Sequence, residues 1–108
     1  MAPAVLGGFE HQVLLAVLRL GSEAYSAPIV MELEKRTGQA VSASKVYVAL
    51  RRLEKKGYLA SRFDPPPGSE GGRDRRVFVL EAPALTILRE SKRNLESLWE
   101  GLPALEES

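Results

Sequence analysis

The chain has 108 residues, of which 44% are hydrophobic and 27% are charged, a balance that predicts one globular domain rather than a disordered segment. Cysteine is absent and His11 is the only histidine, which excludes a disulfide framework, a thiolate or multi-histidine metal site and a cysteine nucleophile. The net charge is only +1, so a nucleic-acid partner has to be argued from local charge.

Two helices are expected in the first third of the chain. The first, at residues 8–20, is apolar nearly all round, which predicts a central buried helix that ends at Gly21. The second starts at Ser26, the expected N-cap, has Pro28 in its first turn and ends at Thr37-Gly38.

A third helix starts at Ser42, again an expected N-cap, and ends before Gly57. At about 100° per residue, one face collects the apolar residues Val46, Ala49, Leu50 and Leu53. The opposite face carries Ser44, Val48, Arg51, Arg52 and Lys55, with Lys45 and Tyr47 on its flanks. This outer face is therefore polar at its N-terminal end and basic at its C-terminal end.

Two short strands and a last helix complete the chain. The strands, at residues 58–63 and 75–80, are joined by a loop rich in proline and glycine at residues 64–72, which predicts a hairpin with a projecting tip. The last helix, at residues 82–102, carries a leucine seam close to heptad spacing, formed by Leu88, Leu95, Leu98 and Leu102 and widened by Leu85 and Trp99.

This order predicts a mainly α protein with a small β-hairpin, namely a winged helix-turn-helix followed by a C-terminal dimerisation helix. We expect a winged helix-turn-helix DNA-binding domain at residues 1–81 and a dimerisation helix with its tail at residues 82–108. An exposed leucine seam favours a homodimer, and we assign its interface to Phe9, Leu85, Leu88, Leu95, Leu98, Trp99 and Leu102. The alternative is that the last helix only covers its own core.

Positive charge is concentrated between residues 45 and 76, which contain nine basic and four acidic residues. A basic helix face beside a basic hairpin is typical of a surface that binds double-stranded DNA, because an α-helix fits the major groove. We assign DNA contacts to Ser42, Ser44, Lys45, Tyr47, Val48, Arg51, Arg52, Arg73, Arg75 and Arg76. In the alternative reading, basic residues only solvate the surface, Tyr47 packs half-buried and Arg51 pairs with Glu54, whereas Arg52 has no acidic neighbour at helical spacing.

Four stretches of the sequence resemble the PadR family of bacterial transcription regulators. They are LGGFEHQVLLAVLRLG, AYSAPIVMELEKRTG, VSASKVYVALRRLEKKGYL and GGRDRRVFVL, in family order. The resemblance implies a winged-helix dimer that represses transcription at a near-palindromic operator and whose last helix packs on the partner's first helix. It makes residues 42–56 the recognition helix, Tyr47 the DNA-contacting tyrosine and Arg73 to Arg76 the base of the wing.

The family resemblance also implies a small aromatic effector near the dimer interface, which Phe9 and Trp99 would hold by stacking. Plain interface packing of these two rings is the alternative. The sequence departs from the family pattern at Ser44-Lys45, where Gly-Ala or Gly-Thr is usual, and this suggests a different operator or a tighter phosphate contact. Ser26 and Glu81 replace a usual Gly and Thr, and the single C-terminal helix matches the short subfamily.

Two other classes of function are alternatives to a DNA-binding regulator. A winged-helix protein–protein interaction module would use the same basic face on an acidic partner. An enzyme is not expected, because the sequence has no visible nucleophile–base pair and GSEGGR lacks the ending of a phosphate-binding loop; no cofactor is expected either. The first eight residues contain no Lys or Arg, and no apolar run near them could span a membrane, so we expect a cytoplasmic protein.

Overall fold

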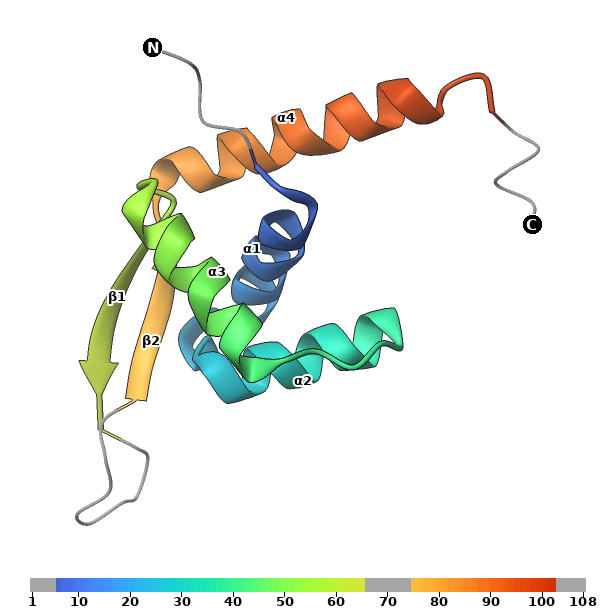
Figure 1. The fold of residues 1–108 in the computed structure, drawn as a ribbon. Coiled ribbons are helices and arrows are strands. Elements are labelled where there is room, and N and C mark those ends of the chain that lie inside the picture. The colour runs from blue at the N-terminus through green and yellow to red at the C-terminus, as the bar shows by residue number, and fades with distance from the viewer. Residues whose placement is uncertain (1–5, 66–74, 103–108) are drawn as a thin grey trace.

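The computed structural model describes residues 6–65 and 75–102 of the chain. Its elements are, in chain order, α1 (Gly8–Leu20), the 3-10 turn η1 (Gly21–Glu23), α2 (Ser26–Thr37), α3 (Ala43–Lys55), β1 (Leu59–Asp64), β2 (Arg75–Leu80) and α4 (Ala82–Trp99). The hairpin stands beside α3, and α4 crosses one end of α1 and extends past the other helices (Figure 1). The fold is the expected winged helix-turn-helix with an added helix.

Local signals fix the ends of α1 and α3. The Ser42 hydroxyl caps α3 by accepting a hydrogen bond from the backbone N–H of Lys45 at 3.3 Å. Gly21 follows α1 with φ +56°, a value that other residues rarely adopt, so the chain leaves the helix there. The predicted cap of α3 is therefore confirmed. The predicted bounds of α1 and of β2, residues 8–20 and 75–80, also agree with the structure.

One expected cap and two expected boundaries were wrong. Ser26 is already the first helical residue of α2; the N-cap is Tyr25, whose backbone is extended and whose side chain makes no capping hydrogen bond. α4 ends at Trp99 rather than at Leu102, because Glu100 leaves the helical conformation and Gly101 follows with φ +86°. β1 starts and ends one residue later than expected.

α3 forms one wall of the hydrophobic core. The four apolar residues of its inner face are buried, as their spacing predicted: Val46, Ala49, Leu50 and Leu53. They belong to the same cluster as Leu14 of α1, Ile29 of α2 and Phe78 of β2, which are fully buried. Burying one such side chain contributes about 1.5–3 kcal/mol to folding, so this contact fixes how α3 is rotated.

The expectation that α1 is buried all round was wrong. Val13, Leu14 and Val17 are buried, but Leu15 and Leu18 are 41% and 47% exposed. The neighbouring elements cover α1 from some sides only, and the stripe through Leu15 and Leu18 stays open on the single chain. Two apolar side chains on α1 are therefore available to a partner.

The hairpin is fixed to the helices at its base. β1 and β2 pair antiparallel, with Leu59 opposite Leu80 and Asp64 opposite Arg75. The Phe78 backbone N–H donates a hydrogen bond to the Ala24 carbonyl at 2.8 Å, which joins β2 to the segment before α2. The expected wing tip, including Arg73, lies outside the described residues.

α4 is anchored to the domain by residues between Ala84 and Ser91. Ala84 and Leu88 are buried in the core, and the Ser91 hydroxyl lies 2.7 Å from Nδ1 of His11. The assignment of Leu88 to a dimer interface was therefore wrong, because its side chain is already used by its own core. No helix in the described ranges has the length and apolar character needed to cross a membrane.

Glu10 is the one buried charged residue among those described. Its carboxylate accepts hydrogen bonds from the Gly7 backbone N–H at 2.8 Å and from Lys56 Nζ at 2.9 and 3.0 Å. Burial alone raises the pKa of Glu10, but the Gly7 hydrogen bond and the charge of Lys56 outweigh it, so the pKa lies below its ordinary value. The pair joins the start of α1 to the end of α3.

We expect Glu10→Gln to lower the free energy of unfolding by about 1–3 kcal/mol at pH 7, because Lys56 loses its counter-ion. A folded-state pKa below the unfolded value means that the carboxylate stabilises the fold above about pH 4.3 and that this contribution is lost as the pH falls further. Urea unfolding of both proteins at pH 7 and pH 3 measures the difference. If the free energies of unfolding of the two proteins differed equally at pH 7 and pH 3, the charge of Glu10 would not be what stabilises the fold.

Candidate nucleic-acid interface

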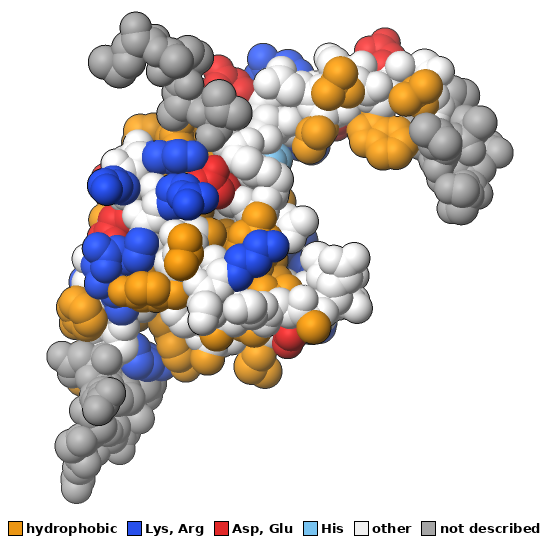
Figure 2. Space-filling model, viewed as in Figure 1, with side chains coloured by type: hydrophobic (Ala, Val, Ile, Leu, Met, Phe, Trp, Pro, Cys, Tyr) orange, Lys and Arg blue, Asp and Glu red, His pale blue; other side chains and the backbone are white. Residues whose placement is uncertain are grey.

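The outer face of α3 is polar, basic and exposed. Because the inner face is buried, the rotation of α3 directs the following side chains to solvent: Ser44, Lys45, Tyr47, Val48, Arg51, Arg52 and Lys55. Figure 2 shows Lys and Arg side chains gathered over α3 and near the hairpin. The structure therefore brings the candidate residues of α3 together on one surface, as their helical spacing predicted.

Arg52 and Lys55 are the least restrained cations of this surface. Within the part of the chain that the structure describes, neither makes a hydrogen bond or an ion pair. Lys56, by contrast, is held by Glu10. The sequence gives Arg52 no acidic neighbour at helical spacing, and in the structure all hydrogen-bond donors of its guanidinium are available.

Phe9 lies beneath the N-terminal end of this surface. The Nζ of Lys45 is 4.3 Å from the centroid of the Phe9 ring, a cation–π contact between α1 and α3. A hollow of about 660 Å³ lies beside this pair, lined by Ser42, Ser44, Val48 and Arg52 among others. The Phe9 ring therefore contacts one of the expected DNA-contacting residues.

The two rings of the expected aromatic site lie on different parts of the single chain. Phe9 lies against α3, whereas Trp99 lies at the far end of α4 and lines a different hollow, with Arg93 and Glu96. Phe9 and Trp99 therefore do not form a common stacking site within one chain. The sequence assigns Phe9 to the dimer interface, and in the single chain its ring packs against the core beneath Lys45.

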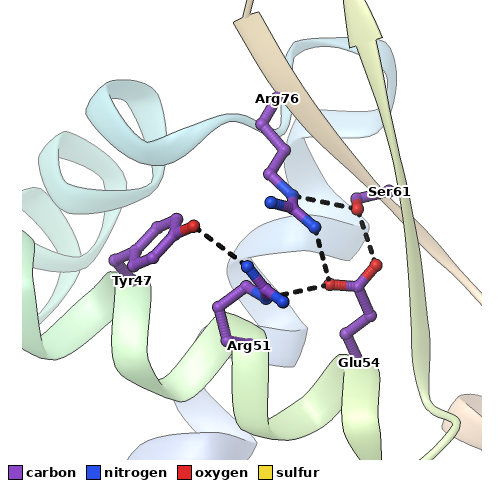
Figure 3. Close-up of polar contacts among 5 residues, drawn as sticks. All are labelled: Tyr47, Arg51, Glu54, Ser61 and Arg76. Carbon is purple, nitrogen blue, oxygen red and sulfur yellow. Dashed lines mark hydrogen bonds and ion pairs between the residues drawn. The ribbon is translucent and has the colours of Figure 1, made fainter.

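A polar cluster links α3 to the hairpin, and Figure 3 shows its five residues. Arg51 donates from Nη1 to the Tyr47 hydroxyl at 3.2 Å, and its Nε lies 3.3 Å from Oε1 of Glu54. The hydrogen bond from Arg51 and the positive charges of Arg51 and Arg76 outweigh the effect of burial and lower the pKa of Tyr47. The Tyr47 hydroxyl thus lies in a positively charged environment, which favours contact with an anion.

Arg76 anchors the hairpin in this cluster. Its Nη2 lies 3.3 Å from Oε1 of Glu54, and its Nε donates to the Ser61 hydroxyl at 3.0 Å. The Ser61 hydroxyl in turn donates to Oε2 of Glu54 at 2.6 Å. The guanidinium also lies 5.2 Å from the centroid of the Phe63 ring. The guanidinium carbon is also 5.8 Å from the centroid of the Phe78 ring, so Arg76 is engaged by several side chains of its own chain.

Arg75 is also directed towards its own chain. Its guanidinium carbon lies 4.3 Å from the centroid of the Tyr25 ring, and Nη1 lies 3.8 Å from Oε1 of Glu23. The sequence assigned Arg75 and Arg76 to DNA, whereas the structure gives each an intramolecular role. Sequence reasoning missed Ser61 and identified Glu54 only as a helical neighbour of Arg51, because the contacts of both with Arg76 join residues distant in sequence.

Comparison with known proteins shows the family of the chain. The model of the PadR-like family of transcriptional regulators matches residues 14–82. A search of curated proteins gave no match. The chain is similar to the crystal structure of a PadR family transcriptional regulator from Eggerthella lenta, with 31% identity and a TM-score of 0.68 over 89% of this chain and 81% of that chain.

Two further solved structures share the fold at lower identity. A PadR-like transcription factor from Bacteroides fragilis is 22% identical, with a TM-score of 0.70 over 90% of this chain and 88% of that one. A PadR-like transcriptional regulator from Bacillus cereus is 20% identical, with a TM-score of 0.69 over 93% and 92%. Because the family model matches more than half of the sequence, the chain belongs to the PadR-like family of transcriptional regulators.

Proposed function

We propose that this chain is a sequence-specific regulator that inserts α3 into the major groove of double-stranded DNA. The observation that carries the proposal is the exposed basic face of α3, where Arg52 and Lys55 make no hydrogen bond or ion pair within the described residues. Unpaired cations on a groove-sized helix bind phosphates, and the polar start of the helix lies where base edges are read. Membership of a family of transcriptional regulators supports this assignment.

The residues of this face have different roles in the proposal. Lys45 contacts a guanine edge or a phosphate, and Val48 contacts a thymine methyl group. Ser42 and Ser44 allow close approach of the backbone, while Tyr47, Arg51 and Arg52 bind phosphates. Arg73 contacts the DNA backbone from the wing, whereas Arg75 and Arg76 act mainly by positioning the hairpin.

The proposal includes a homodimer formed through the outer half of α4. This half carries the exposed side chains of Leu95, Leu98 and Trp99, the exposed Leu102 follows just after the helix, and Leu85 lies nearer the domain. Figure 2 shows hydrophobic side chains along this overhanging part of the molecule. The exposed Leu15 and Leu18 of α1 offer the matching apolar surface, and burial of such surface stabilises a complex by about 25 cal/mol per Å².

A two-fold dimer presents two copies of α3 to one face of DNA, and such a dimer reads a near-palindromic operator. In this account residues 1–81 bind DNA, residues 82–108 dimerise, and the bound dimer represses transcription by occupying the operator. A planar aromatic effector that binds beside Trp99 at the interface would relieve repression.

We expect Arg52→Ala to weaken binding to every duplex alike and to make the slope of log K against log salt shallower by about 0.9, because one phosphate contact is lost. Fluorescence anisotropy with labelled duplexes across a salt series measures both quantities. Arg89→Ala is the matched control, since it removes the same charge from an exposed position of α4.

If Arg52→Ala and Arg89→Ala changed the affinity and the salt slope equally, the assignment of the DNA surface to α3 would be contradicted. If the wild-type protein bound no duplex at any salt concentration, the proposed function would fail, and an acidic protein partner for the same basic face would become the better account.

We expect Leu98→Glu to convert a dimer into a monomer, because it places a charge in the proposed apolar interface. Size-exclusion chromatography with light scattering distinguishes the 11.8 kDa chain from twice that mass. Met31→Glu is the control: Met31 on α2 is 68% exposed, close to the 73% of Leu98, but it lies outside the proposed interface. A wild-type monomer at micromolar concentration, or equal effects of the two substitutions, would count against the dimer.

The fluorescence of Trp99, the only tryptophan, reports on the effector. We expect planar hydrophobic compounds to quench or shift its emission in a saturable way, because stacking on the indole changes its environment. The protein is titrated with a chemically diverse panel of such compounds while its emission is recorded. Emission that no member of the panel changes would contradict an aromatic effector site at Trp99.

A further inference from the structure

We propose that Glu54 competes with DNA for Arg51, and that Arg51 moves from Glu54 to a phosphate when a duplex docks on α3. The inference rests on the proposed function and deepens it, since it assigns a residue that limits affinity for DNA in general. Neither Glu54 nor Ser61 belongs to the set of expected DNA-contacting residues.

Arg51 is held by contacts that are easily exchanged. Its side chain is 49% exposed, and its partners are the Tyr47 hydroxyl at 3.2 Å and one oxygen of Glu54 at 3.3 Å. Single contacts of this kind at the surface contribute little, because water competes for both partners. A phosphate accepts two parallel hydrogen bonds from one guanidinium and is therefore a better acceptor than either.

Glu54, by contrast, is fixed in place. Its side chain is 25% exposed, and Ser61 and Arg76 hold its two oxygens at 2.6 and 3.3 Å (Figure 3). Arg76 lies against the Phe63 ring and bonds Ser61 as well. When Arg51 leaves, Glu54 therefore keeps a counter-ion and its position, which makes the exchange possible without disturbing the hairpin.

The consequence is a restraint on sequence-independent binding. Phosphate contacts attract a protein to any duplex, and a genome offers a very large number of competing sites. The two neighbouring arginines of α3 differ in this respect: Arg52 has no ion-pair partner within the described ranges, whereas Arg51 is held by a fixed carboxylate. Glu54 thus lowers the attraction of the free protein to DNA while leaving Arg51 beside the docking face.

The test is Glu54→Gln, which keeps the shape of the side chain and an oxygen for Ser61 but removes the charge. On a scrambled duplex, followed by anisotropy across a salt series, we expect three- to tenfold tighter binding at an unchanged salt slope, because Arg51 contacts a phosphate in both complexes. The double variant Glu54→Gln/Arg51→Gln should lose this gain in affinity. Glu32→Gln is the matched control: it breaks the equivalent exposed ion pair with Arg36 on α2 and should change neither quantity.

The outcomes separate this inference from the proposed function. If the wild-type protein binds duplexes but Glu54→Gln leaves their affinity unchanged, the inference is overturned and the proposed function stands. The inference is also overturned if the double variant keeps the gain, because the source would then be Arg76 or charge in general. If the wild-type protein binds no duplex, the proposed function itself fails.

A measurement on the wild-type protein covers the case in which Glu54→Gln does not fold, as judged by circular dichroism. NMR of the arginine Nε–Hε groups follows Arg51 and Arg76 while scrambled duplex is added. We expect the Arg51 signal to shift and the Arg76 signal to stay. An unchanged Arg51 signal in a saturated complex would overturn the exchange.

Discussion

Burial of one face of α3 is the constraint on which the rest of the structure depends. Val46, Leu50 and Leu53 are fully buried against α1 and the hairpin, and removing one such leucine side chain costs about 2–5 kcal/mol. This contact fixes the rotation of α3, and the rotation decides which residues reach solvent. The basic surface is therefore a consequence of core packing, because the same helix that fills the core presents its opposite face to a partner.

Positive charge on that surface is divided between binding and structure. Lys56 stabilises the buried carboxylate of Glu10, and Arg76 connects β2 to Glu54 and Ser61. Arg52 makes no ion pair among the described residues, and Arg51 is held only weakly. A count of basic residues therefore overestimates the charge available to DNA. Geometry distinguishes the cations that hold the fold together from those that remain available to a phosphate.

The sequence was sufficient for the fold and for the surface of α3, because helical spacing decides which residues share a face. It was insufficient where contacts join distant residues: Glu10 with Lys56, His11 with Ser91, and Glu54 with Arg76. Local propensity also could not show that Tyr25 rather than Ser26 caps α2, or that Leu15 and Leu18 stay exposed. Those features depend on how the elements pack against one another.

The central claim is that the outer face of α3 reads DNA sequence in a two-fold dimer. Selection of bound duplexes from a random-sequence library, at physiological salt, tests it for any operator sequence. The account predicts enrichment of one motif whose two half-sites are related by two-fold symmetry and lie about one helical turn, or a multiple of it, apart. A bound pool with no enriched motif would contradict sequence-specific binding by this face.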